Sequence, residues 1–412
     1  MLGAVPALAA EPVIDQNFFV PAPIFTDTSP LPAPVPADPS VPVVPATVPT
    51  STALALPALL QAAHDAQAQL SEGVNFDKIT HKNLEQMKLD REISFVFYDK
   101  RTTEVVRVDG LFDGKTWKPT TYTSNNFPAV SVKVTGLSTY TYAFTGDDYV
   151  ILAVRYPRWT EVLKKKKRIG IDEKIAVKTP NQKEFQTPDI AAAGADMLND
   201  VADKAIADLE KRNVMSRAKP GQKLAAVADK NMLTSLYIIE HSSSAELKSN
   251  ASAVIDRFYI NYAVNPTTAY SDQQSYMGAQ GIAQFMPATY TRLAKRTDLG
   301  LIQDVTKGTR DHVNITKAAF ALMDAMEAEL PSSLSSTSSI RLAEAVAGSY
   351  NAGANRVATL IERDVWFDQI DGVLARTAVK KRSRVPVETL DYVQKLRLVL
   401  PVIERRANPS QI

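Results

Sequence analysis

Cysteine is absent from this chain of 412 residues, so disulfides and thiolate chemistry are excluded, and the composition fits oxidising and reducing compartments equally well. Histidine is scarce: the four residues, His64, His81, His241 and His312, lack the spacing of metal ligands, so we expect no metal site, and no motif implies a cofactor. The net charge is only +2 and the one dense basic run, 164–168, is short, which argues against a nucleic-acid partner. No segment offers the roughly 18 uninterrupted apolar residues of a membrane-spanning helix, so no transmembrane span is expected.

Lysine and arginine are missing from residues 1–57, which hold 13 of the 25 prolines. Because proline fixes φ and lacks a backbone donor, this composition favours an extended tether over a packed unit. A proline-rich recognition motif is the alternative. Ala7-Leu8-Ala9 resembles the small-residue cleavage end of a secretory signal peptide, although a basic start and an apolar stretch are missing. We predict that residues 1–57 are a Pro/Ala-rich linker with a signal-peptide remnant.

Residues 58–185 predict a helix followed by a small β-rich accessory domain. Apolar residues recur at helical spacing near its start, and from residue 92 apolar and polar residues alternate as they do in strands. Asp-Gly and Gly-Asp pairs separate the alternating runs and are typical of turns. Because no histidine or carboxylate constellation there suggests chemistry, we expect this region to bind or assemble with a partner.

Residues 186–412 predict an all-helical domain, so the fold class is expected to be α+β. Pro188-Asp189 can begin one helix, and Pro220-Gly221 breaks the chain before a second, which runs from Leu224 to Glu240. The serine-rich stretch 332–339 is expected to be a solvated loop. Further helices are predicted at 287–296, 313–330, 340–348 and 386–406.

Four short segments stand in order within the helical region. They are Leu-Tyr-Ile-Ile-Glu at 236–240, Gly-Ala-Gln-Gly-Ile-Ala-Gln-Phe-Met-Pro at 278–287, Ser-Tyr-Asn-Ala-Gly at 349–353 and Glu-Thr-Leu-Asp-Tyr-Val at 388–393. Together they resemble the soluble lytic transglycosylase family, whose members have a lysozyme-like fold and cut the glycan strands of the bacterial cell wall. The resemblance covers the C-terminal part of the chain only.

The resemblance implies that Glu240 is the catalytic acid. A carboxylic acid must be protonated to donate to a glycosidic oxygen, whereas a free glutamate has a pKa of about 4.3. The apolar residues 236–239 immediately before Glu240 supply surroundings that can raise its pKa. Glu246 follows three serines and lacks this apolar approach.

The resemblance also implies a set of substrate-binding residues. Gly278 and Gly281 would let the backbone approach a sugar without a Cβ in the way. The hydroxyl of Tyr350 is implied to reach toward the catalytic carboxyl, and Glu388 to help hold the substrate. A core tyrosine and an ordinary acid at a helix N-terminus are the simpler readings of those two residues. The implied set is Ser242, Gly281, Gln284, Met286, Tyr350, Asn351, Glu388 and Tyr392.

Two departures from the family pattern accompany these matches. His241 stands where the family has serine; a charged imidazole would lower the pKa of Glu240, unless the ring faces away. Glu240 and Gly278 lie 38 positions apart, much farther than the resemblance implies, so 243–275 contains an insertion. Its aromatic residues could extend a glycan groove or pack a helical insert. They are Phe258, Tyr259, Tyr262 and Tyr270.

The activity implied is cleavage of peptidoglycan glycan strands by one glutamate that gives 1,6-anhydromuramic ends, without the second carboxylate of ordinary glycosidases. A catalytically impaired wall-binding or assembly protein and a lysozyme-type muramidase are the alternatives. The substrate implies export to the periplasm or cell envelope. There, residues 58–185 could contact an envelope or secretion-apparatus protein.

Overall fold

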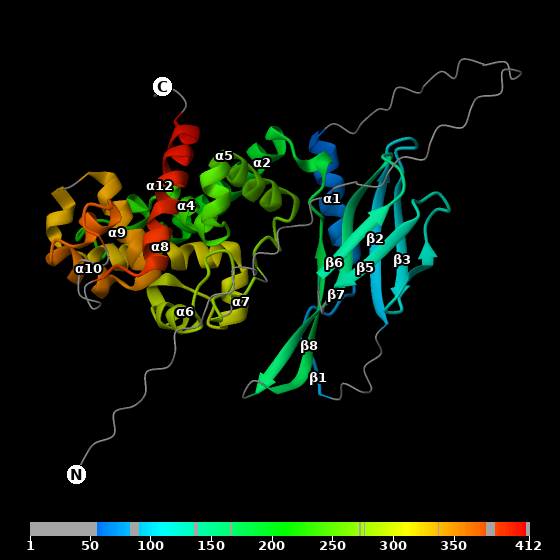
Figure 1. Ribbon diagram of the computed structural model, residues 1–412, viewed down its shortest axis with the longest axis horizontal. Helices are drawn as coiled ribbons and strands as arrows, with labels where there is room; N and C mark the ends of the chain where they lie inside the picture. The colour runs from blue at the N-terminus through cyan, green and yellow to red at the C-terminus, as the bar shows by residue number, and fades with distance from the viewer. Residues whose placement is uncertain are drawn as a thin grey trace, which may run out of the picture. The chain divides into compact units, whose positions relative to one another are not determined.

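The computed structural model describes residues 56–82, 90–135, 139–164, 167–271, 273–275, 277–336, 338–375 and 384–408. These residues belong to one compact unit, Val48–Ile412. Helix and strand are mixed, with a β-rich region ahead of a helical C-terminal part, as predicted (Figure 1). The predicted linker and signal-peptide remnant at 1–57 lies outside the described residues, except for residues 56 and 57.

The N-terminal part of the described chain is one helix and eight strands, all paired antiparallel. A sheet has the strand order β1-β8-β7-β2-β3-β4, and β5 pairs with β6 separately. The sheet extends to Lys178, beyond the alternating pattern found in the sequence. Charged residues interrupt the apolar pattern of β8, and for this reason the sequence did not indicate the strand. The elements are α1 (Leu56–Ser71), β1 (Ile79–His81), β2 (Arg91–Asp99), β3 (Val105–Phe112), β4 (Trp117–Tyr122), β5 (Val130–Thr135), β6 (Thr139–Phe144), β7 (Tyr149–Lys164) and β8 (Lys167–Lys178).

Strand β2 is buried on both faces, and its two faces meet different partners. Val96 and Tyr98 belong to the core that includes the apolar face of α1. Phe95 and Phe97 point the other way, into a cluster with residues of β5 and β6. The ring of Phe95 meets that of Tyr142 edge-on, with 5.2 Å between centroids. Because successive side chains of a strand alternate, this one strand joins both layers.

The C-terminal part is helical, and its predicted helices form with one correction. The helix predicted from Leu224 to Glu240 is two helices, because the side chain of Asp229 caps a new start by accepting from the Met232 backbone N–H. The helices are α2 (Pro188–Lys211), α3 (Leu224–Val227), α4 (Lys230–Glu240), α5 (Ser244–Val264), α6 (Pro287–Ala294), α7 (Val305–Arg310), α8 (His312–Ala328), α9 (Ser339–Ala352), α10 (Ala354–Glu362), α11 (Trp366–Ile370) and α12 (Val387–Ala407).

The serine-rich stretch at 332–339 is not simply a solvated loop. A 3-10 turn spans Ser332–Ser336, and Leu334 within it is buried. The prediction rested on serine content and overlooked the single apolar residue that anchors this turn to the core. Among the helices of the described chain, none combines the length and apolarity that crossing a membrane requires.

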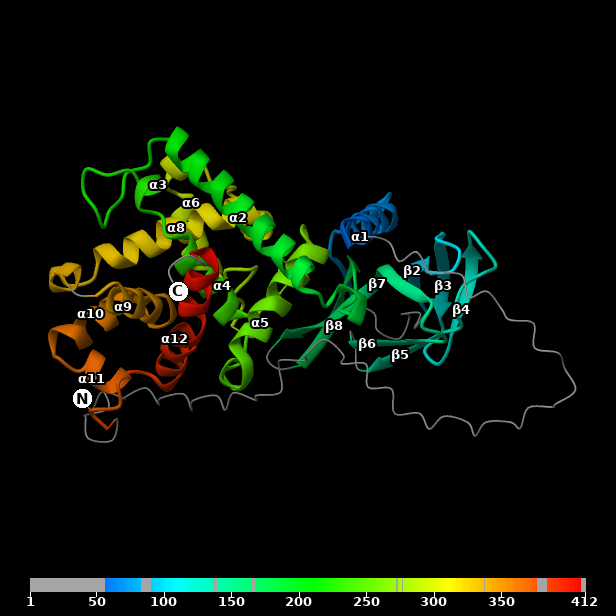
Figure 2. The same cartoon turned by 90° about the horizontal axis from the view of Figure 1, so that it is seen from above.

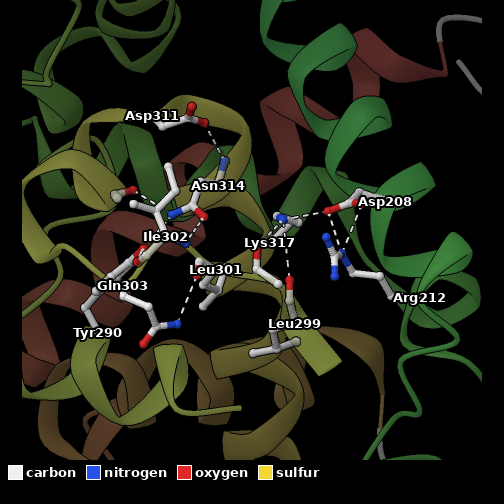
Figure 3. A network of polar contacts seen from close by, with 12 residues as sticks. Asp208, Arg212, Tyr290, Leu299, Leu301, Ile302, Gln303, Asp311, Asn314 and Lys317 are labelled. Atoms are coloured by element: carbon white, nitrogen blue, oxygen red, sulfur yellow. Dashed lines mark hydrogen bonds and ion pairs between the residues drawn. The ribbon is translucent and has the colours of Figure 1, made fainter. Parts of the chain in front are cut away.

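Polar networks fix α2, α6 and α8 to one another (Figure 3). Lys317 of α8 is buried, and its Nζ donates to Asp208 Oδ2 at 2.6 Å and to the Gly300 carbonyl at 3.1 Å, so its charge is matched. Asn314, one turn earlier, donates to the hydroxyl of Tyr290 at 2.6 Å. Tyr290 lies on α6, which directly follows the 278–287 segment. This network therefore anchors the C-terminal end of that segment.

Candidate active site

Glu240 is the last residue of α4, whose residues 232–239 are all buried. Helix α12 lies beside α4, as both views show (Figure 1 and Figure 2). The hydroxyl of Tyr392 on α12 donates to Glu240 Oε1 at 2.7 Å. Glu240 itself is only partly exposed. The first and fourth sequence segments are therefore in direct contact, although 152 positions separate the two residues.

Burial raises the pKa of Glu240 from 4.5 to about 7. The hydrogen bond from Tyr392 and the charge of Lys395 both favour the carboxylate and lower this pKa, but burial outweighs them. Near neutral pH the carboxyl group thus exists in both protonation states. A group of this kind can donate a proton in one step and accept one in the next.

Tyr350 approaches the same place from α9, but its hydroxyl has a different partner. It donates to the backbone carbonyl of Ala283 at 2.6 Å, and not to Glu240. Burial, followed by the charge of Glu240, raises the pKa of Tyr350. The contact implied for Tyr350 is therefore made by Tyr392, whereas Tyr350 holds the 278–287 segment beside the carboxyl group.

The 278–287 segment forms a tight turn in which Gly281 allows close packing against another part of the protein. Gly281 has φ +73°, and a Cβ there would lie 2.2 Å from the carbonyl oxygen of Thr309. Gln284 also has a positive φ, and its side-chain amide donates back to the Gly281 carbonyl at 2.8 Å. Met286 is 41% exposed and ends the turn before α6. The absence of a side chain at Gly281 therefore lets its backbone lie close to the backbone of Thr309.

Replacing Gly281 by Ala is expected to destabilise the protein by about 2–4 kcal/mol, since it adds a clash with backbone to the cost of a positive φ. Gly278→Ala is the matched control. Gly278 has φ +89°, but the nearest atom to an added Cβ is a flexible side-chain nitrogen at 3.8 Å, so only the conformational cost of about 1 kcal/mol applies. Urea unfolding of both variants measures the difference. Equal losses would contradict the packing explanation.

The other implied substrate-binding residues lie at varied depths. Asn351 and Glu388 are exposed, and Asn351 Oδ1 accepts from Thr389 Oγ1 at 2.7 Å, which ties the end of α9 to the start of α12. Glu388 occupies the first turn of α12, where its negative charge also interacts favourably with the helix dipole. Ser242 is 2% exposed, so its side chain is packed inside the protein.

His241 faces away from Glu240. Its Nε2 lies 2.8 Å from the Ile282 carbonyl, and burial lowers the pKa of the imidazole to about 4, so it is neutral at pH 7. The charged imidazole considered from sequence is therefore absent. Phe258, Tyr259 and Tyr262 are buried as well. These three residues of helix α5, and Tyr270 stacked on Phe258, belong to the packing of that helix and do not line a longer glycan groove.

Lys395 is a residue of the site that the sequence motifs did not indicate. It lies three positions after Tyr392 on the same face of α12, and its Nζ is 3.4 Å from the Ile239 carbonyl. Nearby Asp391 accepts from Ser244 Oγ at 2.5 Å, which adds a further contact between α12 and the start of α5. Within the described residues, no group of histidine, cysteine, aspartate and glutamate could hold a metal ion.

A comparison with known families matches part of the helical region. Residues 262–371 match the family model of the transglycosylase SLT domain. The C-terminal part of the chain therefore carries an SLT domain, as the sequence segments predicted. A search of curated proteins and a search of solved structures each found no match.

The matched stretch of the SLT domain contains the 278–287 and 349–353 segments. It begins after Glu240 and ends before Tyr392. The hydrogen bond between these two residues joins the outer segments to each other. His241 Nε2, which bonds to the Ile282 carbonyl, and Thr389 Oγ1, which donates to Asn351 Oδ1, join them to the matched region.

Proposed function

We propose that this protein is a peptidoglycan lytic transglycosylase with a lysozyme-like helical domain, in which Glu240 is the single acid and base. The observation that carries the proposal is the Glu240 carboxyl group, largely buried at the end of an apolar helix, where burial raises its pKa to about 7. The SLT domain supplies the substrate class, the glycan strands of the cell wall.

Two proton transfers account for the reaction. Protonated Glu240 donates its proton to the glycosidic oxygen as the bond between that oxygen and the muramic C1 breaks. The carboxylate then accepts the proton of the C6 hydroxyl, whose oxygen bonds to C1 and closes a 1,6-anhydro ring. No water is consumed. Between the steps, the hydroxyl of Tyr392 and the charge of Lys395 stabilise the carboxylate.

The glycan is proposed to lie along the surface formed by the 278–287 turn and the ends of α9 and α12. Met286 offers an exposed apolar side chain there, and Asn351 and Glu388 offer exposed polar groups. Gln284 and Gly281 shape the turn, and Tyr350 holds it in place. Ser242, which the resemblance placed among the substrate-binding residues, is buried, so no contact with the glycan is proposed for it.

We also propose that the protein acts outside the cytoplasm, in the periplasm or cell envelope, where its substrate lies. The β-rich region within 58–185 would then contact an envelope or secretion-apparatus protein. Side chains exposed on β3 and β4, Val105 and Tyr122, supply apolar surface for such a contact. Pull-down from envelope extracts with residues 58–412, beside a Val105→Asp, Tyr122→Asp variant, tests this: equal capture by both would contradict it.

The activity is tested by incubating the protein with insoluble peptidoglycan and analysing the released fragments by mass spectrometry. The expected fragments end in 1,6-anhydromuramic acid and are one water lighter than hydrolysed fragments. Fragments with water-terminated reducing ends would instead identify a lysozyme-type muramidase. Binding to the insoluble wall with no release over a long incubation would identify a wall-binding protein.

A further inference from the structure

The residue after Glu240 joins three parts of the site. The His241 ring is packed 4.3 Å from the Tyr270 ring, measured between centroids, and Tyr270 stacks on Phe258 of α5 at 4.7 Å. On its other edge, His241 Nε2 lies 2.8 Å from the Ile282 carbonyl. Because a carbonyl oxygen can only accept, the neutral ring carries its proton on Nε2 and donates it.

Two consecutive carbonyls of the 278–287 turn are thus held from two directions. Ile282 accepts from His241, which is covalently joined to Glu240 at the end of α4. Ala283 accepts from Tyr350 of α9. Ile282 and Ala283 are both fully buried, so an unpaired carbonyl there would be costly. The two bonds together fix the turn against the helix end that carries the carboxyl group.

We propose that His241 is a positioning residue: its N–H bond to Ile282 holds the 281–284 turn against the end of α4 and keeps water away from the Glu240 carboxyl group. The inference rests on the proposed function of Glu240. His241 does not exchange protons in this role. It acts through the backbone of the turn and through the dry surroundings of its neighbour.

The groups around both residues fit this role. His241 faces neutral groups: the rings of Phe258 and Tyr270, the side-chain amide of Gln273 and the Ile282 carbonyl. The stacked rings set the plane of the imidazole. As a result, its N–H points at the turn.

Glu240 meets Tyr392 and the charge of Lys395 from α12, and Tyr350 approaches from α9. The charges of Asp391 and Glu246 act on Lys395. None of these partners is supplied by His241, so its removal should change the Glu240 surroundings only by loosening the turn.

Two variants separate the hydrogen bond from the ring. His241→Gln keeps an N–H donor at the position of Nε2, whereas His241→Phe keeps an aromatic ring against Tyr270 but cannot donate. We expect His241→Phe to lower kcat on peptidoglycan at least about tenfold with KM within about twofold, and His241→Gln to stay within about threefold of wild type. The basic limb of the pH profile should move to lower pH in His241→Phe alone, because water admitted to the site lowers the Glu240 pKa.

Equal kcat for His241→Phe and wild type would overturn the inference, as would equal losses in both variants or a change confined to KM. An inactive wild type would count against the proposed function instead. In that case, NMR titration of the Glu240 carboxyl carbon without substrate still decides the inference. The midpoint should fall in His241→Phe and stay at the wild-type value in His241→Gln; equal midpoints in all three proteins would refute it.

Discussion

Replacing Glu240 by Gln is expected to lower kcat on peptidoglycan at least a hundredfold. The amide keeps the size of the side chain and a contact with Tyr392, but it can neither give up a proton to the glycosidic oxygen nor accept one from the C6 hydroxyl. Loss of general acid–base catalysis typically costs about 10²–10⁴ in rate. The rate of release of soluble fragments from the insoluble wall measures the effect.

Glu246→Gln is the matched control, because Glu246 is the other acid near this part of the chain. It caps the start of α5 by accepting from Ser243, a role that glutamine can also fill, and it pairs with Arg257. Its activity should remain close to wild type. A Glu240→Gln protein that releases fragments at the wild-type rate would remove Glu240 from the reaction.

The same Glu240→Gln substitution is expected to stabilise the protein at alkaline pH. The folded-state pKa of about 7 exceeds the ordinary value of 4.5, so the folded protein keeps a proton that the unfolded chain has lost. Wild type therefore loses stability as pH rises from 4.5 to about 7, and the full loss of about 3 kcal/mol persists above pH 7. Glutamine carries no such cost.

Urea unfolding of the two proteins at pH 8 and pH 4.5 tests this. The free energy of unfolding of Glu240→Gln should exceed that of wild type by about 3 kcal/mol at pH 8, and the difference should fall below about 0.5 kcal/mol at pH 4.5. Glu246→Gln should show no such gain, because the pKa of Glu246 is lowered by its hydrogen bonds with Ser243 and its pair with Arg257, despite the opposing effect of burial. A gain of equal size at both pH values would indicate better packing and not relief of a buried charge.

The sequence was most informative where function depends on residues close together in the chain. The apolar run ahead of Glu240 indicated both a buried helix that ends at Glu240 and a raised pKa of its carboxyl group. From the sequence, Gly281 was expected to let the backbone approach a sugar. The close approach of Gly281 to Thr309 could not be inferred, because Thr309 belongs to another helix.

Contacts between distant segments were not predictable in the same way. Tyr350 and Tyr392 were both assigned to the site, yet spacing along the chain does not say which hydroxyl reaches Glu240 and which reaches Ala283. The direction of His241 depends on the helix end and on the ring of Tyr270, so the sequence left both orientations open. Lys395 belongs to no motif, and only the packing of α12 on α4 brings its charge to the carboxyl group.

NMR titration of the Glu240 carboxyl carbon, assigned by its absence from the Glu240→Gln spectrum, tests the proposed mechanism most directly. The mechanism requires a carboxyl group that is still substantially protonated at neutral pH in the free protein. We expect a single transition with a midpoint of about 7. A midpoint near 4.5, the ordinary value for glutamate, would contradict the proposed role of Glu240.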